Sequence, residues 1–216
     1  KRWNPILGEW VVIAPATADR PWNGALVSPA VDQLPEHDPG CYLCPGVARA
    51  GGKTNPMYTG TYVFDNDFPT LSLDYSTAER DGHVPGDIPA RGVCRVVCFS
   101  PRHNITPPVM SEEEVHEIIL TLRGQYDELA SIPEIENVML FENRGKIIGV
   151  SNPHPHGQIY ATDFVPRIPA SRYENARRYR LDTGRCLFCA IMEDEIRYAR
   201  RIIEENDHFV AFIPSF

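Results

Sequence analysis

One stretch of the sequence decides more about this chain than any other: Asn152-Pro153-His154-Pro155-His156-Gly157-Gln158-Ile159-Tyr160. Side chains two apart on a strand point to the same face, so a strand here lines up His154, His156 and Gln158. Pro155 has no amide hydrogen to donate, which favours an edge or bulged strand. Gly157 lets another backbone or a ligand approach closely. Two imidazoles and an amide on one face indicate a polar site, and the alternative is a histidine-rich turn.

A pair of cysteines supplies the next clue. Cys41 and Cys44 form a C-x-x-C knuckle with Pro-Gly turns on both sides, which favours a metal site over a thioredoxin-like redox motif or a plain loop. A tetrahedral zinc site needs two more ligands. His103, just after an apolar strand-like run, and His154 are the candidates. A metal there would lie beside His156 and hold that imidazole in place for nucleophilic or acid–base work.

The other four cysteines divide into two pairs. Cys94 and Cys98 lie four residues apart in an apolar run and are predicted to be buried small hydrophobes on one face of a strand. Cys186 and Cys189 form a second C-x-x-C knuckle. A chain of 216 residues does not depend on disulfides for a core, so the two C-x-x-C knuckles favour metal binding or redox chemistry over cross-links.

Length and charge limit the class of protein. The 216 residues allow one large domain or two small ones. Acidic residues outnumber Lys plus Arg by 29 to 21, a net charge of −8, which argues against a nucleic-acid partner. No apolar run approaches the ~18 residues of a membrane span. The chain starts without a methionine and stops after a strand-like run, so we expect further protein after Phe216, on this chain or on a second one.

The hydrophobic pattern predicts an α+β layer arrangement. Short apolar runs predict strands over 9–14, 92–99, 138–141 and 209–213, and residues 62–69 are predicted to form a short strand that runs into a polar turn. Two helices are predicted. The second covers 190–203, and a polar, arginine-rich stretch lies before it. The first begins after Ser111, which with Glu114 forms a capping box. Its expected apolar stripe is Val115, Ile118, Ile119, Leu122, Tyr126 and Leu129.

A weak internal echo suggests two copies of one module. Each C-x-x-C is followed, after a spacer, by an acidic-Asn-Asp turn beside a strand, at 63–68 and again at 204–210. We therefore predict one complete repeat over 1–175, which contains the active-site strand, and the start of a second over 176–216, cut at Phe216.

Taken together, these residues resemble the galactose-1-phosphate uridylyltransferase family, a branch of the histidine-triad superfamily. The resemblance runs along the whole chain. Its landmarks are Asn4-Pro5, Glu9-Trp10-Val11, Arg20-Pro21-Trp22, Cys41-x-x-Cys44, Tyr62-Val63-Phe64-x-Asn66-Asp67-Phe68, Gly92-Val93, Phe99-Ser100-Pro101, Phe141-Glu142-Asn143 and the Ser151–Gln158 run. It implies a histidine-triad-like antiparallel sheet with helices on one side, the first repeat complete and the second truncated.

The resemblance also implies an activity. Such enzymes move UMP from UDP-glucose to galactose 1-phosphate, a step of galactose metabolism, by a ping-pong reaction through a uridylyl-histidine. By motif match His156 is the nucleophile, and Gln158 donates a hydrogen bond to a phosphate oxygen. An amide cannot supply a proton, which favours transfer to a hexose phosphate over hydrolysis.

Further roles carry over residue by residue. Cys41, Cys44, His103 and His154 match the zinc ligands. Asn66 and Asp67 match the turn that binds the uridine ribose. The residues that match the phosphate-binding positions are Arg20, Asn143, Gly149, Val150 and Ser151.

Two departures from the family stand out. Thr17 occupies a position where some relatives carry another phosphate-site arginine. Some relatives also lack the second C-x-x-C and build a second metal site from a carboxylate, for which Glu174 is the candidate here. In this chain Cys186 and Cys189 are predicted to begin a second zinc site.

The resemblance implies small-molecule substrates, a cytoplasmic enzyme, and either a homodimer or a partner chain that supplies the missing second half. Two alternatives stay open. One is a related nucleotidyltransferase or phosphorylase that uses an ADP-sugar or a dinucleotide. The other is a non-catalytic zinc-bound module.

Overall fold

The structure is a computed structural model that describes residues 1–14, 21, 34–74, 90–145, 148–150 and 152–216. Its contacts divide the chain into two compact units. Unit 1 joins residues 1–27 to residues 165–216, and unit 2 comprises residues 28–164. The predicted repeat boundary between 175 and 176 concerns sequence modules and stays a prediction. No helix in the described ranges is both long enough and apolar enough to cross a bilayer.

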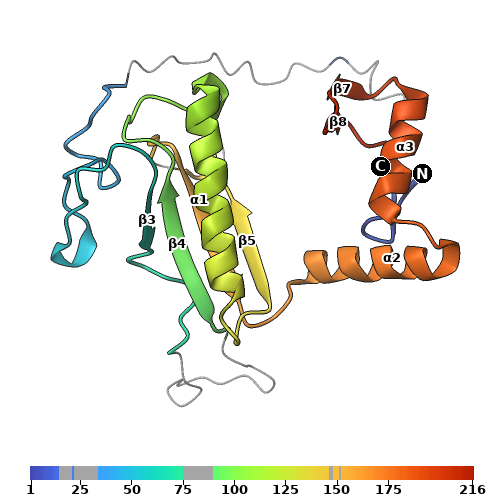
Figure 1. Ribbon diagram of the computed structural model, residues 1–216, viewed down its shortest axis with the longest axis horizontal. Helices are drawn as coiled ribbons and strands as arrows, with labels where there is room; N and C mark the ends of the chain where they lie inside the picture. Colours follow the sequence, from blue (N-terminus) through green and yellow to red (C-terminus); the bar gives the residue numbers. More distant parts are fainter. Residues whose placement is uncertain (15–20, 22–33, 75–89, 146–147, 151) are drawn as a thin grey trace. The chain divides into compact units, whose positions relative to one another are not determined.

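Unit 2 is built on a four-stranded antiparallel sheet (Figure 1). Its strands, in the order β3-β4-β6-β5, are β3 (Tyr62–Asp65), β4 (Gly92–Cys98), β6 (His156–Thr162) and β5 (Asn137–Phe141). The antiparallel α+β fold predicted from the sequence is thereby confirmed. Two short 3-10 helices, η2 (Ala50–Gly52) and η3 (Pro107–Val109), lie in the connections.

Strand β6 occupies the interior of this sheet, so the expectation of an edge or bulged strand is wrong. It pairs with β4 and with β5 without a register shift. Pro155 lies one residue before the strand, and its carbonyl accepts a hydrogen bond from the Phe99 amide at 2.9 Å. The missing amide hydrogen of Pro155 therefore costs the ladder no hydrogen bond.

The two faces of the sheet have different environments because side chains alternate along each strand. One face is covered by the helix α1 (Glu112–Ala130), as Figure 1 shows. Val97, Ile159 and Ala161 from the sheet form the core there with Ile118 and Leu129 of the helix. The register pairs Cys98 with His156 and Val96 with Gln158, which places these four side chains together on the opposite face.

Helix α1 begins where the capping box predicts. The Ser111 hydroxyl accepts from the Glu114 amide at 3.3 Å, and the Glu114 carboxylate accepts from the Ser111 amide at 2.9 Å. The buried stripe is narrower than predicted, because Ile119 is 56% exposed and Tyr126 is 46% exposed.

The opposite face of the sheet packs on the C-x-x-C loop. Cys41, Leu43 and Cys44 form a second buried cluster with Val96 and Cys98. The prediction that Cys94 and Cys98 are buried is confirmed, since the two side chains are 3% and 0% exposed.

Unit 1 contains two hairpins and two helices. The hairpins are β1 (Arg2–Asn4) with β2 (Glu9–Val11), and β7 (Ile202–Glu205) with β8 (Val210–Phe212). The helices are α2 (Arg167–Thr183) and α3 (Leu187–Tyr198). Asn175 ties α2 to the first hairpin by donating to the Ile6 carbonyl at 3.2 Å.

Helix α2 was not predicted, and α3 begins and ends before the predicted 190–203. No residue of α2 is buried, so its charged sequence lacks the apolar stripe that indicates a helix. Helix α3 ends at Tyr198 because Ala199 adopts a left-handed conformation with φ of 59°.

Candidate active site and metal centre

Two cysteines and two histidines come together next to the first residue of β6. One ligand atom from each of Cys41, Cys44, His103 and His154 lies within 4.8 Å of the other three, and all four residues are buried. The Nδ1 atoms of His103 and His154 are 3.6 and 3.5 Å from the Cys44 sulfur. Such a buried set of two thiols and two imidazoles can hold a metal ion.

Three separate segments bring these ligands to one point. Cys41 and Cys44 lie in a tight turn closed by the Cys44 amide, which donates to the Cys41 carbonyl at 3.0 Å. His103 follows the end of β4, and its amide donates to the Glu36 carbonyl at 2.7 Å. His154 lies two residues before β6. The sheet register therefore fixes the distance between the metal cluster and the strand that carries His156.

Neighbouring groups orient the ligand atoms. The Nε2 atom of His154 is 3.0 Å from the Ser100 carbonyl oxygen, which can only accept, so Nε2 carries the proton and Nδ1 keeps its lone pair toward Cys44. The Asn152 amide group donates to the Cys41 sulfur at 3.4 Å. The Asn55 amide group donates to the Cys44 carbonyl at 2.9 Å.

Burial prepares the two imidazoles for metal binding. It lowers the pKa of His154 to about 4, with a further contribution from the nearby His103. Burial also lowers the pKa of His103. Both rings are therefore neutral at pH 7, the form that binds a metal. Burial raises the pKa of Cys44 to about 11, so a cation is needed to stabilise its thiolate.

His156 begins β6 and has a defined tautomer. Its Nδ1 lies 2.8 Å from the carbonyl oxygen of His154, which can only accept a hydrogen bond. Nδ1 therefore carries the proton, and Nε2 keeps a free lone pair. His156 is half-buried and lines two cavities. An imidazole that lines a cavity and keeps a free lone pair on Nε2 is able to act as a nucleophile.

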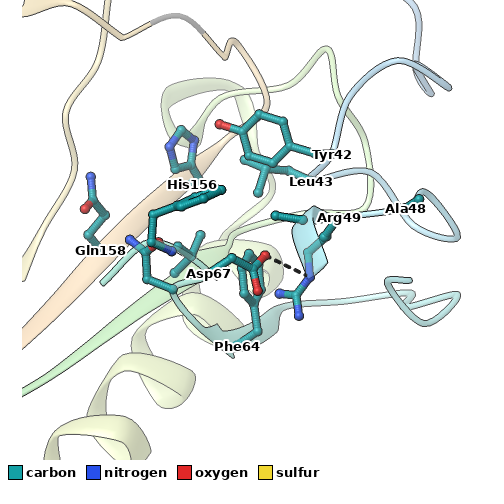
Figure 2. A pocket seen from close by; sticks show the side chains of 12 residues that line it. Tyr42, Leu43, Ala48, Arg49, Phe64, Asp67, His156 and Gln158 are labelled. Atoms are coloured by element: carbon teal, nitrogen blue, oxygen red, sulfur yellow. Dashed lines mark hydrogen bonds and ion pairs between the residues drawn. The ribbon is translucent and has the colours of Figure 1, made fainter. Parts of the chain in front are cut away.

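The first cavity has a volume of about 450 Å³ and combines apolar walls with polar ends. Figure 2 shows His156 and Gln158 on one side of it and the ion pair of Arg49 and Asp67 on the other. Leu43, Phe64 and Val96 are among its apolar lining residues, and Asn66 lies beside Asp67. The prediction placed Asn66, Asp67, His156 and Gln158 in one site, and the structure brings all four to this cavity.

The second cavity, of about 440 Å³, lies on the other side of His156. Asn143 and Val150, two of the predicted phosphate-binding residues, line it. Gly149 has a φ of 82°, a conformation that favours glycine. Arg20, Thr17 and Ser151 lie outside the described residues.

Arg49 is the site residue that the sequence analysis missed. It lines the first cavity, five residues after the C-x-x-C knuckle. A basic residue in a segment of small residues, next to a predicted metal turn, is the signal that could have found it.

The predicted second metal site has no completed ligand cluster in the part of the chain that the structure describes. Glu174 forms an ion pair with Arg177 in α2, at 3.0 Å. Cys186 precedes α3, and Cys189 lies in its first turn. This site stays a prediction.

Known proteins that are similar to this chain belong to one family. The family model for the N-terminal domain of galactose-1-phosphate uridyl transferase matches residues 1–166. The galactose-1-phosphate uridylyltransferase of Haemophilus influenzae is 38% identical over 215 residues, which is 99% of this chain and 61% of that protein. A probable galactose-1-phosphate uridylyltransferase of Drosophila melanogaster is 39% identical, again over 99% of this chain and 61% of the relative.

Solved structures show the same fold. A uridylyltransferase structure superposes with a TM-score of 0.71 at 24% identity, over 99% of this chain and 60% of the other. The ADP-glucose phosphorylase of Arabidopsis thaliana with bound ADP-glucose gives 0.69 at 25% identity, over 99% of this chain and 63% of the other. The chain thus spans about 61% of the length of the first curated relatives it matches.

Proposed function

The chain belongs to the galactose-1-phosphate uridylyltransferase family, and on that basis we propose that it carries the active site for moving UMP from UDP-glucose to galactose 1-phosphate. The observation that carries the proposal is the hydrogen bond from Nδ1 of His156 to the His154 carbonyl, at 2.8 Å. That bond leaves Nε2 as the only nucleophilic nitrogen of the ring, beside a cavity able to take a nucleotide.

The reaction proceeds by two displacements at one phosphorus atom. Nε2 of His156 attacks the α-phosphorus of UDP-glucose, an N–P bond forms, and the P–O bond to the β-phosphate breaks. Glucose 1-phosphate leaves with the electron pair. A phosphate oxygen of galactose 1-phosphate then attacks the same phosphorus, and the P–N bond breaks to restore the imidazole. Gln158 donates an N–H to a non-bridging oxygen and stabilises the charge that develops there.

The remaining predicted residues hold the nucleotide. Asn66 and Asp67 accept hydrogen bonds from the ribose hydroxyls in the first cavity. Asn143 and Val150, which line the second cavity, bind the phosphates, and the family resemblance adds Gly149, Ser151 and Arg20 to this role. Apolar walls from Leu43, Phe64 and Val96 suit a flat base, because they exclude water without demanding hydrogen bonds.

The metal at Cys41, Cys44, His103 and His154 is proposed to be zinc, bound at a closed structural site. Four protein ligands leave no open position for substrate. The residues of this site fit the ion, since Nδ1 of both imidazoles lies within 3.6 Å of the Cys44 sulfur. Its contribution is to fix His154, whose carbonyl in turn orients His156.

Intact-mass spectrometry after incubation with UDP-glucose tests the proposal. We expect one added uridylyl group, which disappears on addition of galactose 1-phosphate and does not form in His156→Asn. His116→Asn is the matched control, because His116 is exposed on α1. An adduct that persists in His156→Asn, or none in the unaltered chain, would refute the proposed role of His156. A non-catalytic zinc module predicts that last result.

One comparison favours ADP-glucose as an alternative nucleotide-sugar substrate, because the chain shares its fold with an ADP-glucose phosphorylase that binds ADP-glucose. Parallel incubations with UDP-glucose and ADP-glucose distinguish the two chemistries. An adenylyl adduct formed faster than the uridylyl adduct would assign the chain to the phosphorylase reaction.

For the whole protein we propose a cytoplasmic homodimer, in keeping with the family resemblance. A partner chain that supplies the rest of the enzyme is the alternative. Sedimentation equilibrium of the 216-residue chain checks this, and a monomer at all concentrations would contradict the homodimer.

A further inference from the structure

A buried cation in the first cavity has no part in the mechanism above. The Arg49 side chain is 7% exposed, and that of its partner Asp67 is 12% exposed. An arginine in a protein stays charged, and burying a charge is costly unless it is paired and hydrogen-bonded. The position of Arg49 therefore needs an explanation that includes its hydrogen-bond donors.

The surroundings of Arg49 hold its guanidinium in one place. Its Cζ lies 3.7 Å from the centre of the Phe64 ring, a cation–π contact. Its backbone amide donates to the Lys53 carbonyl at 2.7 Å, and this hydrogen bond joins the two residues that flank η2. Because the ring and the loop both fix the side chain, Arg49 offers a rigid group to the cavity.

The same arrangement fixes the carboxylate of Asp67. Nε of Arg49 is 3.5 Å from one oxygen, and Nζ of Lys53 is 3.2 Å from the other. Figure 2 shows the Arg49–Asp67 pair at the wall of the cavity. A carboxylate with a cation at each oxygen cannot rotate freely, yet each oxygen keeps a lone pair for a further donor.

Two donors of Arg49 make no hydrogen bond to the described residues, although one of them, Nε, takes part in the ion pair with Asp67. Nε and Nη1 are both buried and make no hydrogen bond to the part of the chain that is described. Buried polar groups are nearly always hydrogen-bonded, and exceptions point to a missing partner. Because Arg49 lines the first cavity, an acceptor oxygen of a bound ligand can supply this partner.

We propose that Arg49 is a positioning residue for nucleoside recognition. It holds Asp67 as the acceptor for the ribose diol, and it donates one of its free N–H groups to an oxygen of the same nucleoside. This inference rests on the proposed function, since it takes the occupant of the cavity to be a uridine nucleotide. Its consequence is that selection of ribose over 2′-deoxyribose depends on Arg49, although Asp67 makes the contact.

Calorimetric titration of the full chain with UDP and with 2′-deoxy-UDP tests the inference. Arg49→Met keeps the packing on Phe64 and removes the charge and the donors. We expect it to weaken UDP binding by about 10- to 100-fold, the loss typical of hydrogen bonds that involve a charged group, and to abolish the preference for UDP. Asp67→Asn should lose the same preference, and the double variant should bind no more weakly than the weaker single variant.

Arg95→Met is the matched control, because Arg95 pairs with Asp65 and Glu128 on the helix-covered side of the sheet. It should bind both nucleotides as the unaltered chain does. Arg49→Lys gives a second test if Arg49→Met does not fold, since a lysine keeps the charge but loses the planar fork, and the UDP preference should still fall.

The outcomes separate this inference from the proposed function. UDP binding with an unchanged ribose preference in both Arg49 variants would overturn the role of Arg49 and leave the proposed function standing. Additive losses in the double variant would also overturn it, since the two residues would then act independently. A failure of the unaltered chain to bind UDP would overturn both.

Discussion

Gly157 has a local role that its place in the sequence only partly revealed. The sequence predicts that another backbone or a ligand comes close to it. In the structure a Cβ at this position would lie 2.7 Å from the Phe99 ring and 3.0 Å from the Phe141 carbonyl oxygen. Both neighbours belong to the protein, so this glycine serves the packing of β6 and leaves the cavities open on the opposite face.

A substitution at Gly157 tests that role. Gly157→Ala should lower the free energy of unfolding by about 1–3 kcal/mol, because Phe99 or the adjoining strand must shift. Urea titration measures the loss. Gly124→Ala is the control: nothing lies within 4 Å of a Cβ there, and the change within α1 should stabilise by about 0.5–1 kcal/mol. Equal effects from the two substitutions would contradict this account.

Among single residues, those named by motifs were the predictable ones. Cys41 with Cys44, and His154 with His156, stand in short, recognisable spacings. His103 stands apart from both and was a candidate because a tetrahedral site needs further ligands, and the structure brings it to the other three. Arg49 was missed because its importance comes from burial, from the Phe64 ring and from Asp67, which lie more than a dozen residues away in sequence. Such tertiary contacts leave no periodic pattern in one chain.

At the scale of elements, α1 depends on the capping box at its first turn. Ser111→Ala removes the hydroxyl that accepts from the Glu114 amide, and we expect a loss of about 1 kcal/mol in the free energy of unfolding. Thermal or urea unfolding followed by circular dichroism measures it. Ser111→Asn should restore most of the loss, since Asn is an equally good cap. If Ser111→Asn unfolds as readily as Ser111→Ala, lost capping is not the cause.

Elements were predictable wherever their apolar pattern was strong. The strands of the sheet and α1 have buried faces, and their periodicity identified them. Helix α2 has no buried residue, so its charged sequence read as a polar stretch. The interior position of β6 was mispredicted because Pro155 was taken as part of the strand. In the structure Pro155 lies one residue before the strand begins.

For the whole molecule, the metal cluster belongs to unit 2 alone. A metal that binds only the folded state stabilises it by mass action, by about 4 kcal/mol at a thousandfold excess over the dissociation constant. We therefore expect chelation, or Cys44→Ser, to lower the melting midpoint of unit 2 by about 10–20 °C. Circular dichroism with metal analysis measures the change, with one zinc per chain expected before chelation.

Cys189→Ser is the matched control for that experiment, because Cys189 is exposed and lies in unit 1. It should leave the midpoint and the zinc content of the first site unchanged. If Cys189→Ser removed the metal and Cys44→Ser did not, the assignment of the first site would be wrong.

His154 is used twice, once through its ring and once through its backbone carbonyl. Replacing the four metal ligands with apolar side chains would keep the interior filled. It would also free the His154 backbone, and the proton would then no longer be held on Nδ1 of His156. Any redesign of that corner must preserve a peptide oxygen within about 3 Å of the reactive ring. The peptide unit of His154 therefore links the stability of the metal site to the reactivity of His156.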